Sequence, residues 1–170
     1  MGLMYELLPF DNTLVTLKVT GAELKKLIEH GLHPEDFRPG QFYGIEVWYD
    51  KDAKAGERIT SMRLLDGTII KDDQYYSVST LDFLLTGGDN YDFSKAKEVV
   101  DTYIPVRDLI ADMIREEEVI SHKYVEHLHI GKDERLPAAG SVGDGLYYGM
   151  GMISLVAAGF LTGKGKKKTA

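Results

Sequence analysis

The sequence predicts an α+β fold, a mixed β-sheet domain with flanking helices, followed by a C-terminal hydrophobic helix. Three observations predict it. Four segments rich in β-branched and aromatic residues lie between residues 13 and 85, and two amphipathic helical patterns accompany them. An apolar run without charged side chains closes the chain. The total of 170 residues is enough for one hydrophobic core.

The expected elements follow from local patterns. Thr13–Thr20 alternates β-formers and predicts a strand. The helix that follows has apolar residues at helical spacing, and Gly31 is a suitable C-cap. Pro105 begins a second helix with one apolar face. The other strands are expected over 44–49, 59–65 and 75–85, with loops over 33–43 and 131–144 and no clear preference over 119–130.

Composition excludes several classes of protein. There are 27 acidic and 20 basic side chains, and the net charge is −7. A nucleic-acid polymer needs a clustered basic face, so we expect no nucleic-acid partner. The absence of cysteine excludes a disulfide scaffold, a thiol nucleophile and cysteine-bound zinc.

The C-terminal run predicts a transmembrane segment over residues 145–163. No charged side chain occurs there, and a helix of that length would measure roughly 28 Å, close to the ~30 Å of a bilayer core. The basic tail over 164–170 carries four lysines, which the positive-inside rule assigns to the cytoplasm. The alternative is a buried C-terminal helix, although a helix in a soluble domain rarely lacks charge on every face.

A pentapeptide before this run, Leu136-Pro-Ala-Ala-Gly140, is of the Leu-Pro-x-x-Gly type. With the apolar run and basic tail it resembles the sorting signal of surface proteins that sortase attaches to the Gram-positive cell wall. The resemblance implies cleavage between Ala139 and Gly140, with sortase and peptidoglycan as partners, although the family usually has Thr where Ala139 stands. We therefore expect the domain outside the cell, at its surface. Residues 1–6 show no signal peptide, which suggests a C-terminal fragment of a longer protein.

Three short segments carry candidate binding chemistry. Pro9 fixes a bend that presents Phe10 and Asn12 just before a strand. Gly44 would let the backbone approach a partner closely. Phe83 and Asp89 flank a double glycine. Two rings, an amide and a carboxylate suit a flat base, stacked between the rings and hydrogen-bonded at its polar edges. The alternative is that both phenylalanines are core residues and the glycines form a tight turn.

These segments, in this order and spacing, resemble the C-terminal domain of the 5′-nucleotidase family, which includes bacterial UDP-sugar hydrolases and ecto-5′-nucleotidases. The similarity covers residues 5–115 and includes Pro-Phe-x-Asn-Thr, Gly-Ile-x-x-x-Tyr-Asp and Phe-x-x-x-Gly-Gly-Asp-x-Tyr elements. The resemblance implies that Phe10 and Phe83 clamp the nucleobase. It also implies that Asn12, Gly44 and Asp89 line the nucleoside site.

Departures from the family limit what this chain does alone. Family members carry a preceding catalytic domain whose metal ligands come from Asp-x-His, Gly-Asn-His-Asp/Glu and His-x-His elements. Only the third has a similar sequence here, at His127-Leu-His129, after the nucleoside domain, and we assign it no metal. The Gly-rich stretch just before the Pro-Phe element is also missing, so residues 1–130 are expected to form an N-terminally truncated domain. We expect no cofactor in this chain, two divalent metal ions in a missing N-terminal domain, and no activity of the isolated chain.

The sequence thus predicts the nucleoside-binding part of a cell-surface 5′-nucleotidase that acts in extracellular nucleotide catabolism. Three alternatives remain open at this point. They are a 2′,3′-cyclic-nucleotide or UDP-sugar hydrolase on the same scaffold, a non-enzymatic surface module, and a truncated gene product.

Overall fold

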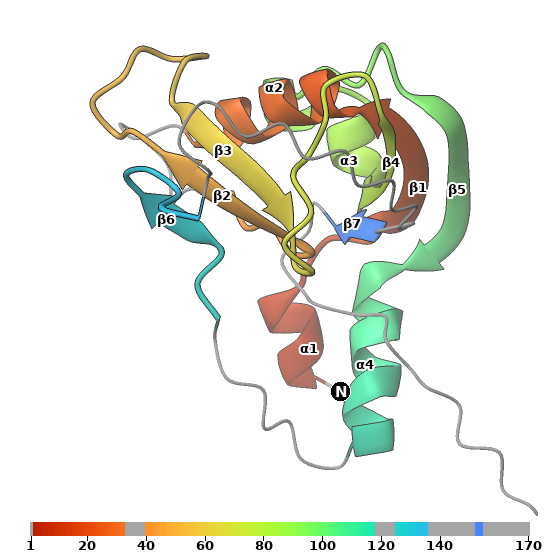
Figure 1. The fold of residues 1–170 in the computed structure, drawn as a ribbon. Coiled ribbons are helices and arrows are strands. Elements are labelled where there is room, and N and C mark those ends of the chain that lie inside the picture. The colour runs from red at the N-terminus through yellow and green to blue at the C-terminus, as the bar shows by residue number, and fades with distance from the viewer. Residues whose placement is uncertain (1, 33–39, 118–124, 136–151, 155–170) are drawn as a thin grey trace, which may run out of the picture.

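The computed structural model describes residues 2–32, 40–117, 125–135 and 152–154. These residues form two sheets with helices packed around them (Figure 1). The expectation of a mixed-sheet α+β domain is confirmed. The predicted sorting motif at 136–140 and the predicted tail at 164–170 lie outside the described residues.

The first sheet has the strand order β5-β1-β4-β7. Strand β1 (Thr13–Thr20) runs antiparallel to both β4 (Tyr75–Leu81) and β5 (Lys97–Pro105). Alternate residues of β1 face the core, which is the burial pattern that its alternating sequence predicts. The segment 7–12, which carries the first candidate residues, therefore enters the sheet at a fixed position.

The second sheet has the order β3-β2-β6. Strands β2 (Ile45–Tyr49) and β3 (Ile59–Leu64) pair antiparallel, and β6 (Leu128–Ile130) pairs parallel to β2. Helix α2 (Gly21–Gly31) packs against β1 of the first sheet and β3 of the second, and it buries Leu24, Leu27 and Ile28. Its N-cap is Thr20, whose hydroxyl accepts a 3.3 Å hydrogen bond from the Glu23 amide. Residues of α2 and both sheets thus share one hydrophobic core.

Helices α1 (Gly2–Leu7) and α4 (Val106–Glu117) lie side by side below the sheets (Figure 1). Pro105 ends β5 and the helix begins at the next residue, close to the expected start. Arg107 joins the two helices, because its guanidinium lies over the Tyr5 ring at 4.1 Å from the centroid.

The structure differs from the sequence expectations at several elements. The strand expected over 75–85 ends at Leu81, and helix α3 (Asp82–Leu85) follows. The reason is the Asp82 carboxylate, which accepts hydrogen bonds from the amides of Thr13 (3.0 Å) and Phe83 (2.8 Å) and so turns the chain out of the sheet. Helix α1 and strand β5 are elements that the sequence patterns did not indicate.

Residues 131–135, expected in an exposed linker, pack on the second sheet instead. Asp133 is only 4% exposed and pairs with the buried Arg63 of β3. Arg135 bonds Glu46 of β2 at 2.8 Å and lies over the Trp48 ring. The contacts of the domain therefore continue to residue 135, beyond the expected boundary at residue 130.

The expected helix over 145–163 falls mostly outside the described residues. Its three described residues form strand β7 (Met152–Ser154), which pairs parallel with β4. An unpaired strand edge offers free backbone N–H and C=O groups, and β7 occupies such an edge of β4. Within the described ranges, no helix has both the length and the apolar character that a membrane crossing requires.

Candidate functional site

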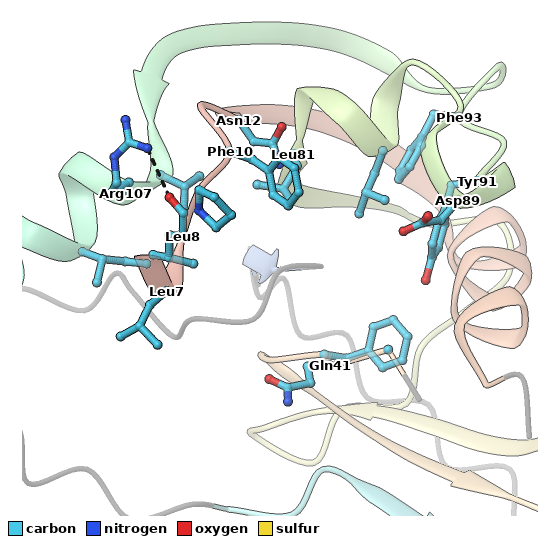
Figure 2. Close-up of a pocket in the computed structure, with 16 residues that line it drawn as sticks. Leu7, Leu8, Phe10, Asn12, Gln41, Leu81, Asp89, Tyr91, Phe93 and Arg107 are labelled. Atoms are coloured by element: carbon cyan, nitrogen blue, oxygen red, sulfur yellow. Dashed lines mark hydrogen bonds between the residues drawn. The ribbon is translucent and has the colours of Figure 1, made fainter. Parts of the chain in front are cut away.

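A cavity of about 460 Å³ opens where the α1–β1 segment, the end of β4 and the start of α4 meet (Figure 2). It is framed mainly by apolar and aromatic side chains with a few polar groups, which is the usual composition of a small-molecule site. The lining residues are Leu7, Leu8, Pro9, Phe10, Asn12, Gly40, Gln41, Phe42, Leu81, Leu84, Asp89, Tyr91, Phe93, Val106, Arg107 and Ile110.

Phe10 and Asn12 form one wall of this cavity. Arg107 fixes their segment, because it donates a 3.1 Å hydrogen bond to the Leu8 carbonyl (Figure 2). The Arg107 guanidinium also pairs with the Asp11 carboxylate. The backbone carbonyl of Asn12 accepts a 2.9 Å hydrogen bond from the Val106 amide, so the side chain of Asn12 is left out of this contact. Phe10 is nevertheless 72% exposed. A large apolar ring held in solvent by a fixed backbone is well placed to stack on a ligand.

Asp89 and Tyr91 form the opposite wall, on the turn after α3. The backbone of this turn is left-handed at three points, with φ of 94° at Gly87, 50° at Asp89 and 61° at Asn90. The last two are non-glycine residues in a costly conformation. Burial raises the pKa of the Tyr91 phenol, and the Asp89 charge raises it further. The phenol of this lining residue is therefore neutral and can both donate and accept a hydrogen bond.

Helix α2 supports this second wall. The His30 ring meets the Tyr91 ring edge-on, with centroids 4.6 Å apart. A Cβ added at Gly31 would come within 2.6 Å of the Tyr91 hydroxyl oxygen and 2.7 Å of Phe42 Cζ. Only glycine at this position lets both rings approach the helix so closely.

The structure brings three of the five expected nucleoside-site residues to this cavity, namely Phe10, Asn12 and Asp89. Phe83 is not among its lining residues. The Phe83 ring lies against Gly88, where an added Cβ would be 2.5 Å from the ring. Gly44 is also outside the lining, and its φ of 85° serves the bend before β2. The expected sortase residues Ala139 and Gly140 lie outside the described part of the chain.

Several lining residues were not assigned a role from the sequence. Tyr91 closes the Gly-Gly-Asp-x-Tyr element and Phe42 lies in the Gln41–Ile45 segment, so both were within reach of the motifs. Arg107 had no such signal, because its partner Asp11 is 96 positions away in the sequence.

His127 and His129 are not part of a metal-binding cluster in the described part of the chain. No three His, Cys, Asp or Glu side chains of those residues lie close enough together to bind a metal ion. His129 stacks on Trp48 with centroids 4.7 Å apart, and His127 meets Tyr43 edge-on at 5.3 Å. Both histidines thus help to hold the β6 segment beside β2 within the second sheet.

Comparison with known proteins agrees with this architecture. Residues 1–97 match the model of the 5′-nucleotidase C-terminal domain family. The human 5′-nucleotidase is 34% identical over 98 residues, which are 52% of this chain and 17% of the human protein. The trifunctional nucleotide phosphoesterase YfkN of Bacillus subtilis is 32% identical over 98 residues, 54% of this chain and 7% of that protein.

A solved structure extends the likeness beyond the matched residues. The crystal structure of a 5′-nucleotidase precursor from Thermus thermophilus superposes with a TM-score of 0.68 at 25% identity. The superposition covers 75% of this chain and 27% of that one, so this chain corresponds to a small part of its relatives. On the family match and this shared fold, the chain belongs to the 5′-nucleotidase C-terminal domain family.

Proposed function

We propose that this chain is the nucleoside-binding part of a cell-surface 5′-nucleotidase-type phosphohydrolase that acts in extracellular nucleotide catabolism. The observation that carries the proposal is the meeting of Phe10, Asn12 and Asp89 at one cavity in a domain of this family. Their segments lie far apart in the sequence, and β1 and the turn after α3 bring them together.

The cavity supports a specific arrangement of the nucleoside. Its volume of about 460 Å³ lies within the range of small-molecule sites. Phe10 offers one stacking face, and Tyr91 and Phe93 lie on the opposite side of the cavity (Figure 2). Phe93 is a buried core residue, so Tyr91 is the ring better placed to meet a ligand. Asn12 presents both a donor and an acceptor to the base, and the Asp89 carboxylate is an acceptor suited to ribose hydroxyls. The geometry favours Tyr91 over Phe83 as the second ring of the clamp.

Typical free energies of stacking and association predict weak nucleoside binding by this chain alone. Stacking contributes roughly 1–3 kcal/mol per base–aromatic contact, so two rings supply about 2–6 kcal/mol. Association costs several kcal/mol of lost motion. We therefore expect a Kd for adenosine no tighter than about millimolar, which corresponds to roughly 4 kcal/mol.

We assign phosphate hydrolysis to a separate catalytic domain that holds two divalent metal ions. The described residues offer no cluster of metal ligands, and neither His127 nor His129 lines the nucleoside cavity. In this arrangement the present domain supplies recognition, and the isolated chain does not release phosphate.

An NMR titration with adenosine tests the nucleoside proposal. Saturable shifts of the Asn12, Asp89 and Tyr91 amides are expected, and Phe10→Ala and Tyr91→Ala should each weaken binding. Phe83→Ala is the discriminating variant. A loss of affinity equal to that of Tyr91→Ala would restore Phe83 to the clamp. Shifts scattered outside the cavity, or the same affinity in Phe10→Ala, would contradict the proposal.

The longer protein allows a test of activity. With this domain joined to its catalytic domain, Phe10→Ala should raise the KM for AMP more than it lowers kcat, because the ring contacts the base and not the phosphate. Parallel assays with 2′,3′-cyclic AMP and UDP-glucose identify which phosphate ester the enzyme prefers. An unchanged KM for every substrate would remove Phe10 from the site.

We also propose that the run over 145–163 anchors the protein in the membrane, with sortase and peptidoglycan as further partners. The support is its lack of charge and the four lysines that follow. A membrane span requires Met152–Ser154 to leave the edge of β4, so the two placements are exclusive. Protease treatment of intact cells and mass spectrometry of the released C-terminus would separate them. Cleavage after Ala139 supports sortase processing, and full protection inside cells contradicts the proposal.

A further inference from the structure

A second cavity lies along α2 and shares no lining residue with the cavity proposed to bind the nucleoside, which we call the nucleoside cavity. Its volume is about 440 Å³. Helix α2 supplies one wall, and the loop before β3 and the turn before β4 supply the others. The lining residues are Ala22, Lys25, Lys26, Glu29, His30, Ala55, Gly56, Arg58 and Asp72, and we call this cavity the α2 cleft.

Arg58 is the unusual residue of the α2 cleft. Its side chain lines the cleft, yet the residue is only 7% exposed. Its Nε and Nη1 atoms are buried and have no hydrogen-bond partner. Two buried guanidinium donors without an acceptor are costly, so a site of this kind favours an anion.

The Glu29 carboxylate, which also lines the cleft, binds backbone amides instead of Arg58. Its two oxygens accept hydrogen bonds from the backbone amides of Ile59 (2.6 Å) and Gly56 (3.2 Å). These bonds fix the loop that carries Arg58 against α2. Neither Glu29 nor Asp72, the two acidic residues of the cleft, accepts a hydrogen bond from the Nε or Nη1 atom of Arg58. Glu29 thus positions Arg58 without satisfying its buried donors.

Two further cations border the cleft from α2. Lys26 is held by Glu23, with Nζ 2.9 Å from the carboxylate oxygen. Lys25 has no ion pair among the described residues and is free to reach a ligand. The cleft therefore combines one buried guanidinium donor with one flexible ammonium donor, which suits the several oxygens of a small oxyanion.

We propose that the α2 cleft binds a small oxyanion of the phosphate class, with Arg58 as its main donor and Lys25 as the second. The proposal does not depend on nucleoside binding, because the two cavities share no lining residue. His30 nevertheless connects the two cavities. It lines the cleft, and its Nε2 lies 2.7 Å from the carbonyl oxygen of Asp89, which lines the nucleoside cavity. The His30 ring is therefore a spectroscopic reporter for occupancy of the cleft.

Titration of the whole chain with inorganic phosphate, followed by NMR at constant ionic strength, tests this site. The Arg58 Nε–H signal, the Gly56 amide and the His30 ring protons should shift together and saturate. Arg58→Gln should weaken phosphate binding about tenfold or more, the loss of one charge-assisted contact, and Lys25→Gln should weaken it less. Lys51→Gln, at an exposed lysine outside the cleft, is the matched control and should leave the affinity unchanged.

Two measurements keep the proposal open to refutation. The wild-type Arg58 Nε–H signal needs no variant, and its failure to shift with phosphate would overturn the assignment. Equal affinity in Arg58→Gln and Lys51→Gln would do the same. Arg58→Met shows whether a variant at this position still folds. Because it replaces a buried charge by an apolar side chain, it should not lower Tm in phosphate-free buffer. Phosphate should raise Tm for the wild type and not for Arg58→Met, and an equal rise in both would also contradict the site.

Discussion

His30 donates a hydrogen bond from Nε2 to the backbone carbonyl of Asp89, with the two atoms 2.7 Å apart. The bond joins the last turn of α2 to the left-handed turn that carries Asp89 and Tyr91. Non-glycine residues in this backbone conformation persist only where their surroundings hold them. His30 thus positions one wall of the proposed nucleoside cavity, although the residue does not line that cavity.

Replacement of His30 by alanine should loosen this wall. The net contribution of one hydrogen bond to stability is roughly 0.5–1.5 kcal/mol. If the wall loses this energy, the affinity for adenosine should fall about two- to tenfold. NMR relaxation should show greater motion at the Asn90 amide in the variant. His30→Gln retains an N–H donor and should recover part of the affinity. Unchanged affinity together with unchanged relaxation in His30→Ala would show that the turn holds itself.

Asp133 should make the domain sensitive to acid. Burial alone would raise the pKa of this carboxyl, but hydrogen bonds from Arg63 and Arg135 outweigh it and lower the pKa to about 2. The unfolded pKa of Asp is about 3.9, so the folded state binds fewer protons between these values. This contribution to the free energy of unfolding is full well above about pH 4 and is lost as the pH falls toward about 2.

Urea unfolding between about pH 7 and about pH 2.5 checks this prediction. Asp133→Asn should be less stable than the wild type at neutral pH, because Arg63 then lacks its buried anion, and the difference should shrink at acid pH. Asp73→Asn, at an exposed position on the turn before β4, is the control. Parallel pH profiles for the wild type and Asp133→Asn would refute the assignment.

His127 should add a second pH dependence near neutrality. Burial lowers its pKa and His129 lowers it further, while Glu46 acts in the opposite direction. A lowered folded pKa means that the unfolded chain binds the proton first as the pH falls. The free energy of unfolding should therefore decrease as the pH drops below about 6.5, the ordinary pKa of histidine. His127→Gln should give a flatter profile between about pH 7 and about pH 5, and an equally steep one would contradict the prediction.

Local sequence patterns predicted the elements whose contacts are regular. Strand β1 and helix α2 lie where their periodicity indicates, because each buries one continuous face. Strand β5 escaped notice because its pairing with β1 is interrupted by register shifts, and left-handed residues at Glu98 and Tyr103 break the alternation. Parallel pairing of β6 and β7 with distant strands leaves no local pattern either.

At the candidate site, too, local motifs predict some residues, and long-range contacts determine others. The motifs contained Phe10, Asn12 and Asp89, which meet at one cavity. Tyr91 lines this cavity and Phe83 does not, which depends on the direction in which α3 turns the chain. That direction is set by the contact of Asp82 with Thr13, 69 positions away, and no local motif records it.

Gly21, the first residue of α2, should not tolerate a side chain. An added Cβ would lie 2.2 Å from the Lys71 carbonyl oxygen, which is backbone and cannot rotate away. The Gly21 and Ala22 amides donate to the carbonyls of Gln74 (2.9 Å) and Asp72 (3.1 Å), so the helix cannot withdraw without breaking both bonds. Gly21→Ala should therefore lower the free energy of unfolding by about 1–3 kcal/mol, measured by urea unfolding.

Gly67 supplies the matched control, because its constraint is conformational and not steric. An added Cβ there meets nothing within 4 Å, but its φ is +89°. Gly67→Ala should also destabilise the domain, by about 1 kcal/mol, and Gly67→Asn should recover part of the loss, since asparagine tolerates a left-handed backbone. Gly21→Asn should recover nothing, because its Cβ meets the same carbonyl. A Gly21→Ala protein as stable as the wild type would show that α2 can move off the turn before β4, which its two backbone hydrogen bonds otherwise forbid.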